Sequence, residues 1–356
     1  MVFKNHFKKI TAGIILVIIA TAVFFSIQNR NPKVSEQVGV DPKILQSEKV
    51  TPEILPVSLL LDNGGWYTAQ TFNNCAPAAL SMSLAYYGIY VDQQTIANTL
   101  RPNNNTSGKN DEKSTPPEQI AAEAEKHGLV AYYRPNGSID LLKRMNAAGF
   151  PVIVRTRLNA KEDYAHYRVV KGYNDIDRVI IQEDGYEGEH VAYSYTEFEQ
   201  LWKPFHNEYV VFATPEKKIK LESILGADLN ELAAWKEAVV KADTPFALSV
   251  ALYHLGDYQG SVDAFKKAEP VLTKHALWYH IEPIKSLYEL GEYEKVFLLA
   301  DQIFKDGNVA YTELYVVLGK SYLKQGNTAA ARIAFETALR YNKNFKSAQE
   351  ALAEMQ

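Results

Sequence analysis

Cysteine is the scarcest reactive residue of this protein, because its 356 residues contain only one, Cys75. One cysteine cannot pair within its own chain, so a disulfide-stabilised scaffold is excluded. The sequence also has no surplus of positive charge, because it contains 38 basic and 42 acidic side chains. This balance argues against nucleic-acid binding. The remaining composition, 47% hydrophobic and 22% charged, is that of a folded protein. The length suggests two or three domains.

Several motifs that would announce a cofactor or another chemistry are absent from the sequence. It has no HExxH or CxxC pattern, so it predicts no metal site, and it has no GxSxG motif of a serine hydrolase. Gly319-Lys320-Ser321 resembles the end of a phosphate-binding loop, but Leu314 stands where that loop needs a glycine. We therefore expect neither a nucleotide nor another cofactor.

The N-terminal segment predicts a membrane anchor. The uncharged apolar run 10–27 would span about 27 Å as a helix, close to the hydrocarbon thickness of a bilayer. Lys4, Lys8 and Lys9 precede it, so residues 1–27 would form a cytoplasmic N-terminus and a single-pass anchor, with the domains outside. Ala20-Thr21-Ala22 offers an alternative, cleavage by signal peptidase and secretion, although the apolar run continues beyond it.

The remainder of the chain divides by composition. Residues 28–55 are polar with scattered prolines and predict a tether. From Pro56 the sequence becomes apolar and aromatic, which indicates the start of a folded domain. A short linker is expected near 215–228, followed by an all-α region over 229–356.

The all-α region contains an internal repeat. Gly256, Gly291 and Gly326 recur every 35 residues, and apolar positions at fixed offsets predict two helices around each glycine turn. A leading helix over 229–242 and a capping helix over 346–355 would flank the three units. The pattern resembles the tetratricopeptide repeat, which implies a concave surface for a protein or peptide partner. A simple helical spacer is the alternative.

A helix is predicted to begin at the cysteine. Apolar residues recur at helical spacing as far as Leu84, and Gly88 follows as a stop signal. Asn73 or Asn74 would cap the helix and place Cys75 in its first turn. There the unpaired backbone N–H groups and the helix dipole stabilise a thiolate. Position alone leaves two readings open, a reactive thiol and a small buried hydrophobe.

A histidine and an aspartate lie on two predicted strands further along the chain. His166 opens an alternating Tyr/Val strand that ends in a turn at Gly172 and Asn174-Asp175. A second apolar strand ends on Asp184. In an antiparallel hairpin the two side chains can adjoin, so that the carboxylate orients the imidazole and the imidazole takes the thiol proton of Cys75.

At these positions the sequence resembles the bacteriocin-processing-like cysteine peptidases, papain-fold relatives of the domain that cleaves double-glycine leaders. The blocks are QTFNNCAPAALSMSLAYYG, HYRVVKGYND and VIIQEDGY, and the resemblance implies an α+β papain-like domain over residues 56–215. The resemblance implies that Cys75 is the nucleophile, His166 the general base and acid, and Asp184 the residue that orients the imidazole. It also implies that Gln70 donates its side-chain amide to the oxyanion.

The sequence departs from the family pattern at two positions. Ala76 replaces the glycine that usually follows the cysteine, and Gly185 replaces a proline after the aspartate. Neither change removes a catalytic atom. The leading hypothesis is a membrane-anchored peptidase that cleaves peptides or proteins outside the membrane, with the repeats docking a partner. The alternatives are an inactive binding protein and an acyl-transfer enzyme of transglutaminase-like or amidase type.

Overall fold

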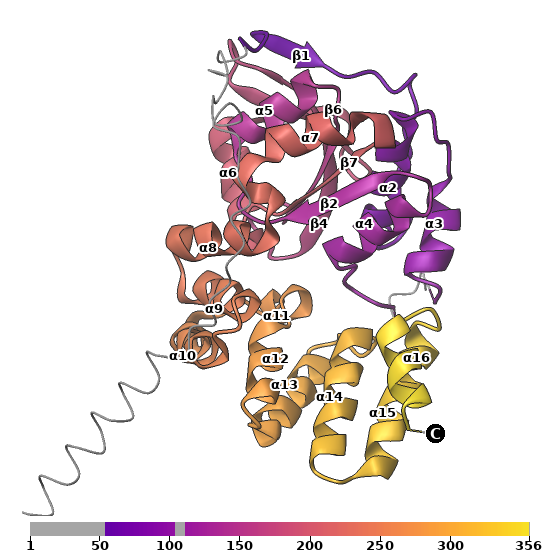
Figure 1. Ribbon diagram of the computed structural model, residues 1–356, viewed down its shortest axis with the longest axis vertical. Helices are drawn as coiled ribbons and strands as arrows, with labels where there is room; N and C mark the ends of the chain where they lie inside the picture. The colour runs from indigo at the N-terminus through magenta and orange to yellow at the C-terminus, as the bar shows by residue number, and fades with distance from the viewer. Residues whose placement is uncertain (1–53, 104–110, 356) are drawn as a thin grey trace, which may run out of the picture. The chain divides into compact units, whose positions relative to one another are not determined.

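The computed structural model describes residues 54–103 and 111–355 of the chain (Figure 1). The predicted anchor over 10–27, and the tether as far as residue 53, lie outside the described residues. Within the described ranges, no helix combines the length and the apolar character that crossing a bilayer requires. The chain from Leu55 onward forms one compact unit.

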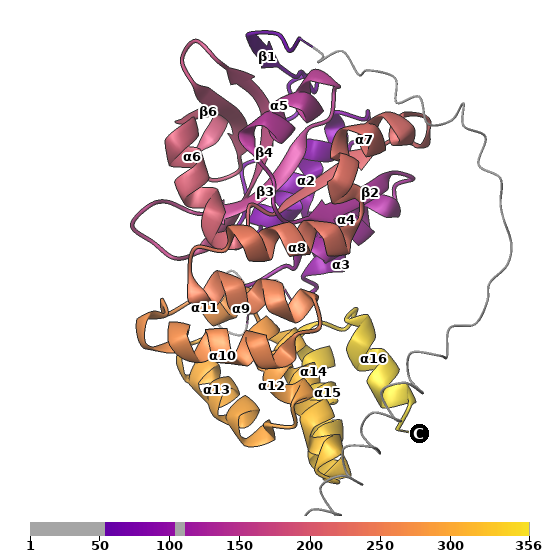
Figure 2. The same cartoon turned by 60° about the vertical axis from the view of Figure 1, so that its left-hand side comes forward.

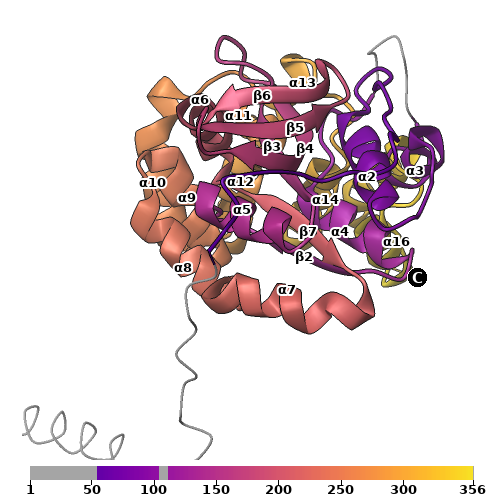
Figure 3. The ribbon, with the colours of Figure 1, turned by 90° about the horizontal axis from the view of Figure 1, so that it is seen from above.

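One antiparallel sheet organises the N-terminal half of this unit. Six strands follow the order β2-β7-β3-β4-β5-β6, and β1 pairs with β4 outside that path (Figure 3). The strands are β1 (Ser58–Leu60), β2 (Val130–Arg134), β3 (Val152–Arg157), β4 (Ala165–Asn174), β5 (Val179–Asp184), β6 (Gly188–Ser194) and β7 (Tyr209–Ala213).

The predicted hairpin is present as β4 and β5, with one difference. Gly172 lies inside β4 and not in the turn, which begins at Asp175. The reason is the close approach of β1, because a Cβ on Gly172 would lie 2.3 Å from the carbonyl oxygen of Leu59. The pairing with β5 also shifts register between Val170 and Gly172. This glycine therefore admits a third strand and does not end the second.

Helices cover both faces of the sheet and bury two apolar cores. The first core joins the sheet to α2 (Cys75–Ala85), α3 (Gln93–Leu100) and α4 (Pro117–Glu125). The second joins it to α5 (Ile139–Ala147), α6 (Tyr195–Trp202) and α7 (Lys218–Leu225). Every residue of α2 after Cys75 is buried, so this helix is held tightly from all sides. The predicted α+β class of this half is confirmed.

Residues 215–228, expected to form a linker, are helical. Two short 3-10 helices, η3 (Pro215–Lys217) and η4 (Gly226–Leu229), flank α7. Leu221 and Leu225 of α7 are buried in the second core. This segment, which has the composition of a linker, is thus held against the sheet by two buried leucine side chains.

The C-terminal half is a stack of helices, named here the repeat array (residues 231–353). It contains α8 (Glu231–Lys241), α9 (Pro245–His254), α10 (Tyr258–Ala268), α11 (Ala276–Tyr279), α12 (Glu282–Glu289), α13 (Tyr293–Lys305), α14 (Thr312–Lys324), α15 (Thr328–Tyr341) and α16 (Lys346–Ala353) (Figure 2). Gly256, Gly291 and Gly326 each adopt φ 77° in the turns between paired helices. The predicted helical pairs, the leading helix and the capping helix are confirmed.

The second helical pair differs from the regular pattern. A four-residue helix, α11, precedes α12 and is separated from it at His280 and Ile281. Pro283 lies in the first turn of α12, where its missing N–H costs no hydrogen bond, so a new helix starts there. The α10–α11 connection, residues 269–275, carries the chain back toward the sheet, as the contacts below show.

Candidate active site

Cys75 is the first residue of α2, as predicted, and is half-buried. Asn74 occupies the N-cap position, but its side chain does not cap the helix. Its Oδ1 instead accepts a hydrogen bond of 2.5 Å from Nη1 of Arg101. The same guanidinium donates to the carbonyl oxygen of Asn73, whose φ of 55° is left-handed. The helix N-terminus therefore keeps uncapped N–H groups beside the sulfur, and an arginine fixes the turn that precedes it.

His166 and Asp184 meet at the ends of β4 and β5. Nε2 of His166 lies 2.7 Å from Oδ1 of Asp184, and both side chains are buried. Because Val169 pairs with Glu183, one further step along the register brings Asp184 beside Arg168, so His166 is its diagonal neighbour. The carboxylate thus holds Nε2, which leaves Nδ1 as the ring nitrogen for the thiol.

The thiol of Cys75 and the imidazole of His166 interact through a hydrogen bond and through their charges. Burial raises the pKa of the thiol, but the hydrogen bond and charge of His166, and the backbone N–H of Tyr167, outweigh burial and lower the pKa overall. Burial lowers the pKa of His166, while its hydrogen bonds to Asp184 and Cys75 raise the pKa above the ordinary value. These opposite shifts favour a thiolate beside an imidazolium.

Asp184 is fully buried and is held by several donors. Besides the imidazole, its Oδ1 accepts a hydrogen bond of 2.7 Å from the backbone N–H of Tyr186, and its Oδ2 lies 2.7 Å from Nε of Arg168. Burial raises the pKa of this carboxyl, but His166 and Arg168 outweigh burial and bring the pKa down to about 2. The group is therefore a carboxylate throughout the physiological range.

Gln70 is joined by one backbone hydrogen bond to the segment that follows Asp184. Its N–H donates to the carbonyl oxygen of Gly185 at 2.7 Å, so the segment before α2 is tied to the residue that follows Asp184. A Cβ on Gly185 would lie 3.1 Å from Cβ of Gln70 and 3.3 Å from Cβ of Ala78. Glycine therefore fits closely where the family pattern has proline.

A small pocket opens beside Cys75. Ala76 lines it, although this residue is only 2% exposed and packs in the first core. Arg155 from β3 and Tyr279 from α11 complete another part of the wall. The repeat array thus contributes a side chain to the pocket of the cysteine, which the sequence does not predict.

Two buried arginines that support the site also escape sequence reasoning. Arg101 is 3% exposed and pairs with Asp111 at 2.5 Å, while it holds the turn before α2. Arg168 is 0% exposed and donates to the backbone carbonyl of Leu158 at 2.7 Å while it balances Asp184. The alternation of side chains along β4 places Arg168, two residues after His166, on the same face of the sheet. This alternation is the sequence signal that could have indicated Arg168 as a neighbour of the site.

Among the described residues, one cluster has the composition of a metal site. Ligand atoms of His206, Glu208 and His280 lie within 4.8 Å of one another, and all three side chains are buried. Burial and the charge of His280 lower the pKa of His206 to about 4, so that imidazole is neutral. However, Glu208 already pairs with Arg155 at 2.5 Å and accepts from the hydroxyl of Tyr133 at 2.8 Å. A guanidinium in this position repels a cation, and Glu208 is already engaged in an ion pair, so the cluster is poorly suited to a metal ion.

Comparisons with known proteins agree with this geometry. Residues 62–210 match the model of the Peptidase_C39 like family, and residues 312–345 match the model of the tetratricopeptide repeat. No curated protein shows a significant match to the chain.

Solved structures of low identity resemble part of the chain. A C39-like peptidase from Bacillus anthracis is 19% identical over 44% of this chain and 97% of its own, with a TM-score of 0.36. The peptidase domain of Streptococcus ComA, a bifunctional ABC transporter of a quorum-sensing pathway, is 18% identical over 42% and 96%, with a TM-score of 0.33. A double-glycine-motif protease from an AMS/PCAT transporter, solved with its leader peptide, is 20% identical over 41% and 87%, with a TM-score of 0.30. The predicted resemblance is confirmed: the chain carries a C39-like peptidase segment followed by a tetratricopeptide repeat.

Proposed function

We propose that this protein is a cysteine peptidase that cleaves peptide or protein substrates through an acyl-thioenzyme at Cys75. The observation that carries the proposal is the arrangement of Cys75, His166 and Asp184 at the start of α2 and the ends of two paired strands. Family membership of the segment supports a peptidase, and the low pKa of the thiol supplies the nucleophile that the reaction requires.

Each residue has a defined task in the proposed reaction. The thiolate of Cys75 attacks the scissile carbonyl carbon, and the carbonyl π electrons move to oxygen to give a tetrahedral oxyanion. The oxyanion collapses, the C–N bond breaks, and His166 gives its proton to the departing amine. Water, deprotonated by the same imidazole, then attacks the thioester and releases the acid and the thiol. Asp184 keeps the imidazole oriented through both halves.

The oxyanion requires donors that are in place before it forms. The backbone N–H of Cys75 at the helix start and the side-chain amide of Gln70 are the proposed pair. The hydrogen bond from Gln70 N–H to Gly185 fixes that backbone relative to Asp184. Loss of one oxyanion donor costs about 3–4 kcal/mol of transition-state stabilisation, so Gln70→Ala should reduce turnover about 100-fold or more.

Alkylation of the full chain with iodoacetamide tests the activated thiol. Because Cys75 is the one cysteine, every alkylated product reports on it. The lowered pKa of Cys75 predicts fast alkylation well below the pH at which an ordinary thiol ionises, and His166→Ala should raise the midpoint of the pH–rate profile. At pH 6 we expect the alkylation rate of His166→Ala to be about 10- to 100-fold lower than that of the wild-type chain. Equal profiles for the two proteins would show that the imidazole does not activate the sulfur.

Digestion of a peptide mixture tests the reaction itself. The wild-type chain should generate new peptide termini detectable by mass spectrometry, and Cys75→Ala should generate none. Addition of a primary amine during the digestion separates hydrolysis from acyl transfer, because transfer would yield the amide in place of the acid.

The cellular context is a further part of the proposal. The anchor over 10–27 and the position of the domains outside the membrane rest on the sequence pattern alone. Fractionation and protease treatment of intact cells test both: we expect the protein in the membrane fraction and its C-terminal half to be degraded from outside. The partner role of the repeats is tested by crosslinking through surface positions of the repeat array.

A further inference from the structure

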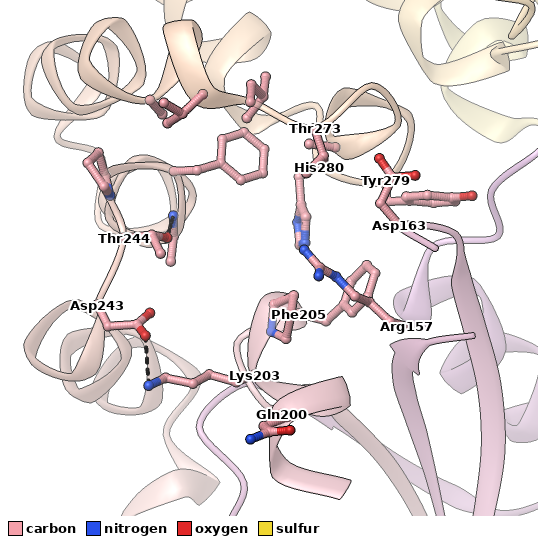
Figure 4. Close-up of a pocket in the computed structure, with 18 residues that line it drawn as sticks. Arg157, Asp163, Gln200, Lys203, Phe205, Asp243, Thr244, Thr273, Tyr279 and His280 are labelled. Atoms are coloured by element: carbon pink, nitrogen blue, oxygen red, sulfur yellow. Dashed lines mark hydrogen bonds and ion pairs between the residues drawn. The ribbon is translucent and has the colours of Figure 1, made fainter. Parts of the chain in front are cut away.

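A cavity beside the repeat array lies between α6 and η2 (Lys203–Phe205) on one side and α9 and the α10–α11 connection on the other (Figure 4). It has a volume of about 500 Å³. Figure 4 shows the Lys203–Asp243 pair at one side of the space, and Arg157, Asp163 and Tyr279 at the other. The catalytic arrangement described above does not use this space.

The α10–α11 connection is fixed against the loop that leads into β4. His275 places Nδ1 at 2.5 Å from Oδ1 of Asp163, and its backbone N–H donates to Oδ2 of the same carboxylate at 3.0 Å. The ring of His275 also stacks on Tyr164 with centroids 4.4 Å apart. Asp163 lies three residues before His166. The repeat array is therefore anchored to the segment that presents the catalytic histidine.

Tyr279 connects the cavity to the cysteine. It lines both the cavity and the small pocket beside Cys75. Its hydroxyl contacts the backbone N–H of Ala165, the residue before His166, and its carbonyl accepts a hydrogen bond of 3.3 Å from Arg155. Tyr279 is thus a side chain shared by the walls of the two spaces.

The walls of the cavity select the kind of occupant. Phe205, Phe246, Ala247 and Leu272 present apolar surface, and Val271 lies at its exposed edge with 79% of its surface accessible. Both carboxylates of the rim already have cationic or imidazole partners, since Asp243 pairs with Lys203 at 2.7 Å and Asp163 with His275. An incoming basic side chain therefore finds no unpaired carboxylate here, whereas an apolar one removes surface from water.

We infer that this cavity is a substrate subsite, which binds an apolar side chain of the peptide close to the scissile bond, with Tyr279 as the gate residue between it and Cys75. The inference rests on the proposed peptidase function. It assigns the repeat array a direct role in cleavage specificity, in addition to any partner that the array binds elsewhere.

Peptide binding to the full chain carrying Cys75→Ala tests the subsite without relying on turnover. The probes are fluorescein-labelled octapeptides in which one position at a time is fixed as Leu, Phe, Lys, Asp or Gly. We expect one position at which Leu or Phe binds at least fivefold more tightly than Lys or Asp. Adding Val271→Asp should reduce that preference at least fivefold, because a carboxylate at the cavity edge opposes apolar burial.

Val240→Asp is the matched control, since Val240 on α8 is 78% exposed and does not line the cavity. It should leave the binding of the same peptides within twofold of the parent. A Val271→Asp chain that binds as the control does, or a library without any Leu or Phe preference, overturns the subsite. If the apolar preference is preserved but the wild-type chain, which keeps Cys75, hydrolyses no peptide, the subsite is supported and the peptidase proposal is overturned. An alkylation rate of Cys75 equal to that of the wild type in the single variant Val271→Asp, which keeps the cysteine, shows that this substitution leaves the chain folded.

Discussion

The two halves of the molecule bury different kinds of side chain. Around the sheet, charged residues are buried in pairs, and they include Arg101, Arg155, Arg168, Lys171, Glu183, Asp184 and Glu208. In the repeat array, residues 231–353, the buried polar side chains are hydroxyls, amides and two histidines, and its lysine–carboxylate pairs are half-buried, as in Lys285–Glu313, or exposed, as in Lys305–Asp301. The sheet half thus buries paired charged side chains, whereas the array half buries uncharged polar and apolar side chains.

The array holds its helices close with small side chains. Ser249 donates to the carbonyl oxygen of Ser261 at 2.7 Å, and Ser286 donates to the hydroxyl of Ser261 at 2.8 Å. These short contacts link α9, α10 and α12 without a bulky residue between them. The sheet half, in contrast, requires each buried charge to keep its partner, because an isolated one would be strongly destabilising. The two halves should therefore fail in different ways when mutated.

The largest effect is expected from Arg168→Met. This change keeps much of the apolar volume but leaves Asp184 buried with one partner fewer, so we expect a loss of about 3–5 kcal/mol in the free energy of unfolding. Urea denaturation measures it. Lys305→Met on α13 is the matched control, because its partner Asp301 is exposed, and it should cost less than about 1 kcal/mol. Similar losses at the two sites would contradict the distinction between the halves.

Asp184→Asn should change the acid stability of the protein. The folded pKa of about 2 lies below the ordinary value of 3.8, so the carboxylate stabilises the fold above about pH 4. That contribution, about 2 kcal/mol, is lost as the pH falls from 4 through 2. The Asn variant should lack this part of the acid dependence. The surface variant Asp301→Asn should follow the wild-type dependence of stability on pH. Thermal melts at a series of pH values measure both variants and would reveal a departure from either expectation.

A smaller effect is expected from Gly319→Ala in α14. A Cβ there would lie 2.3 Å from Cε1 of Phe335 on α15, so a methyl group forces the helices apart. We expect a net loss of about 1–2 kcal/mol, since overpacking outweighs the gain in helix propensity. The double variant with Phe335→Leu should lose less than the sum of the two single variants. Strict additivity, measured by denaturation, would show that the two positions do not clash.

The sequence predicts most of the local structure correctly because its signals are local. The existence of α2 follows from the apolar residues that recur at helical spacing after Cys75, and the array follows from glycines spaced by a fixed period. The hairpin that brings His166 to Asp184 follows from alternation and a turn. Each of these depends on residues within about one repeat of each other.

The contacts that the sequence does not predict join distant residues. Tyr279 reaches the cysteine pocket through a break in a repeat helix, and nothing near it in the chain marks that role. Residues 215–228 have a linker composition, yet two leucines bury against a core formed by earlier segments. The small size of Gly172 likewise serves β1, more than 100 residues away. Such long-range pairings have no periodic signature.

The composition of the first apolar core limits where this protein can be truncated. Trp235 of α8 and Val250 of α9 pack in the same core as Leu80 and Met82 of α2. An expression fragment that stops after the sheet would therefore leave α2, the helix that begins at Cys75, without part of its apolar cover. The transferable unit for grafting, crystallisation or directed evolution extends through α9 at least, and the boundary between the sheet half and the repeat array runs inside the first repeat.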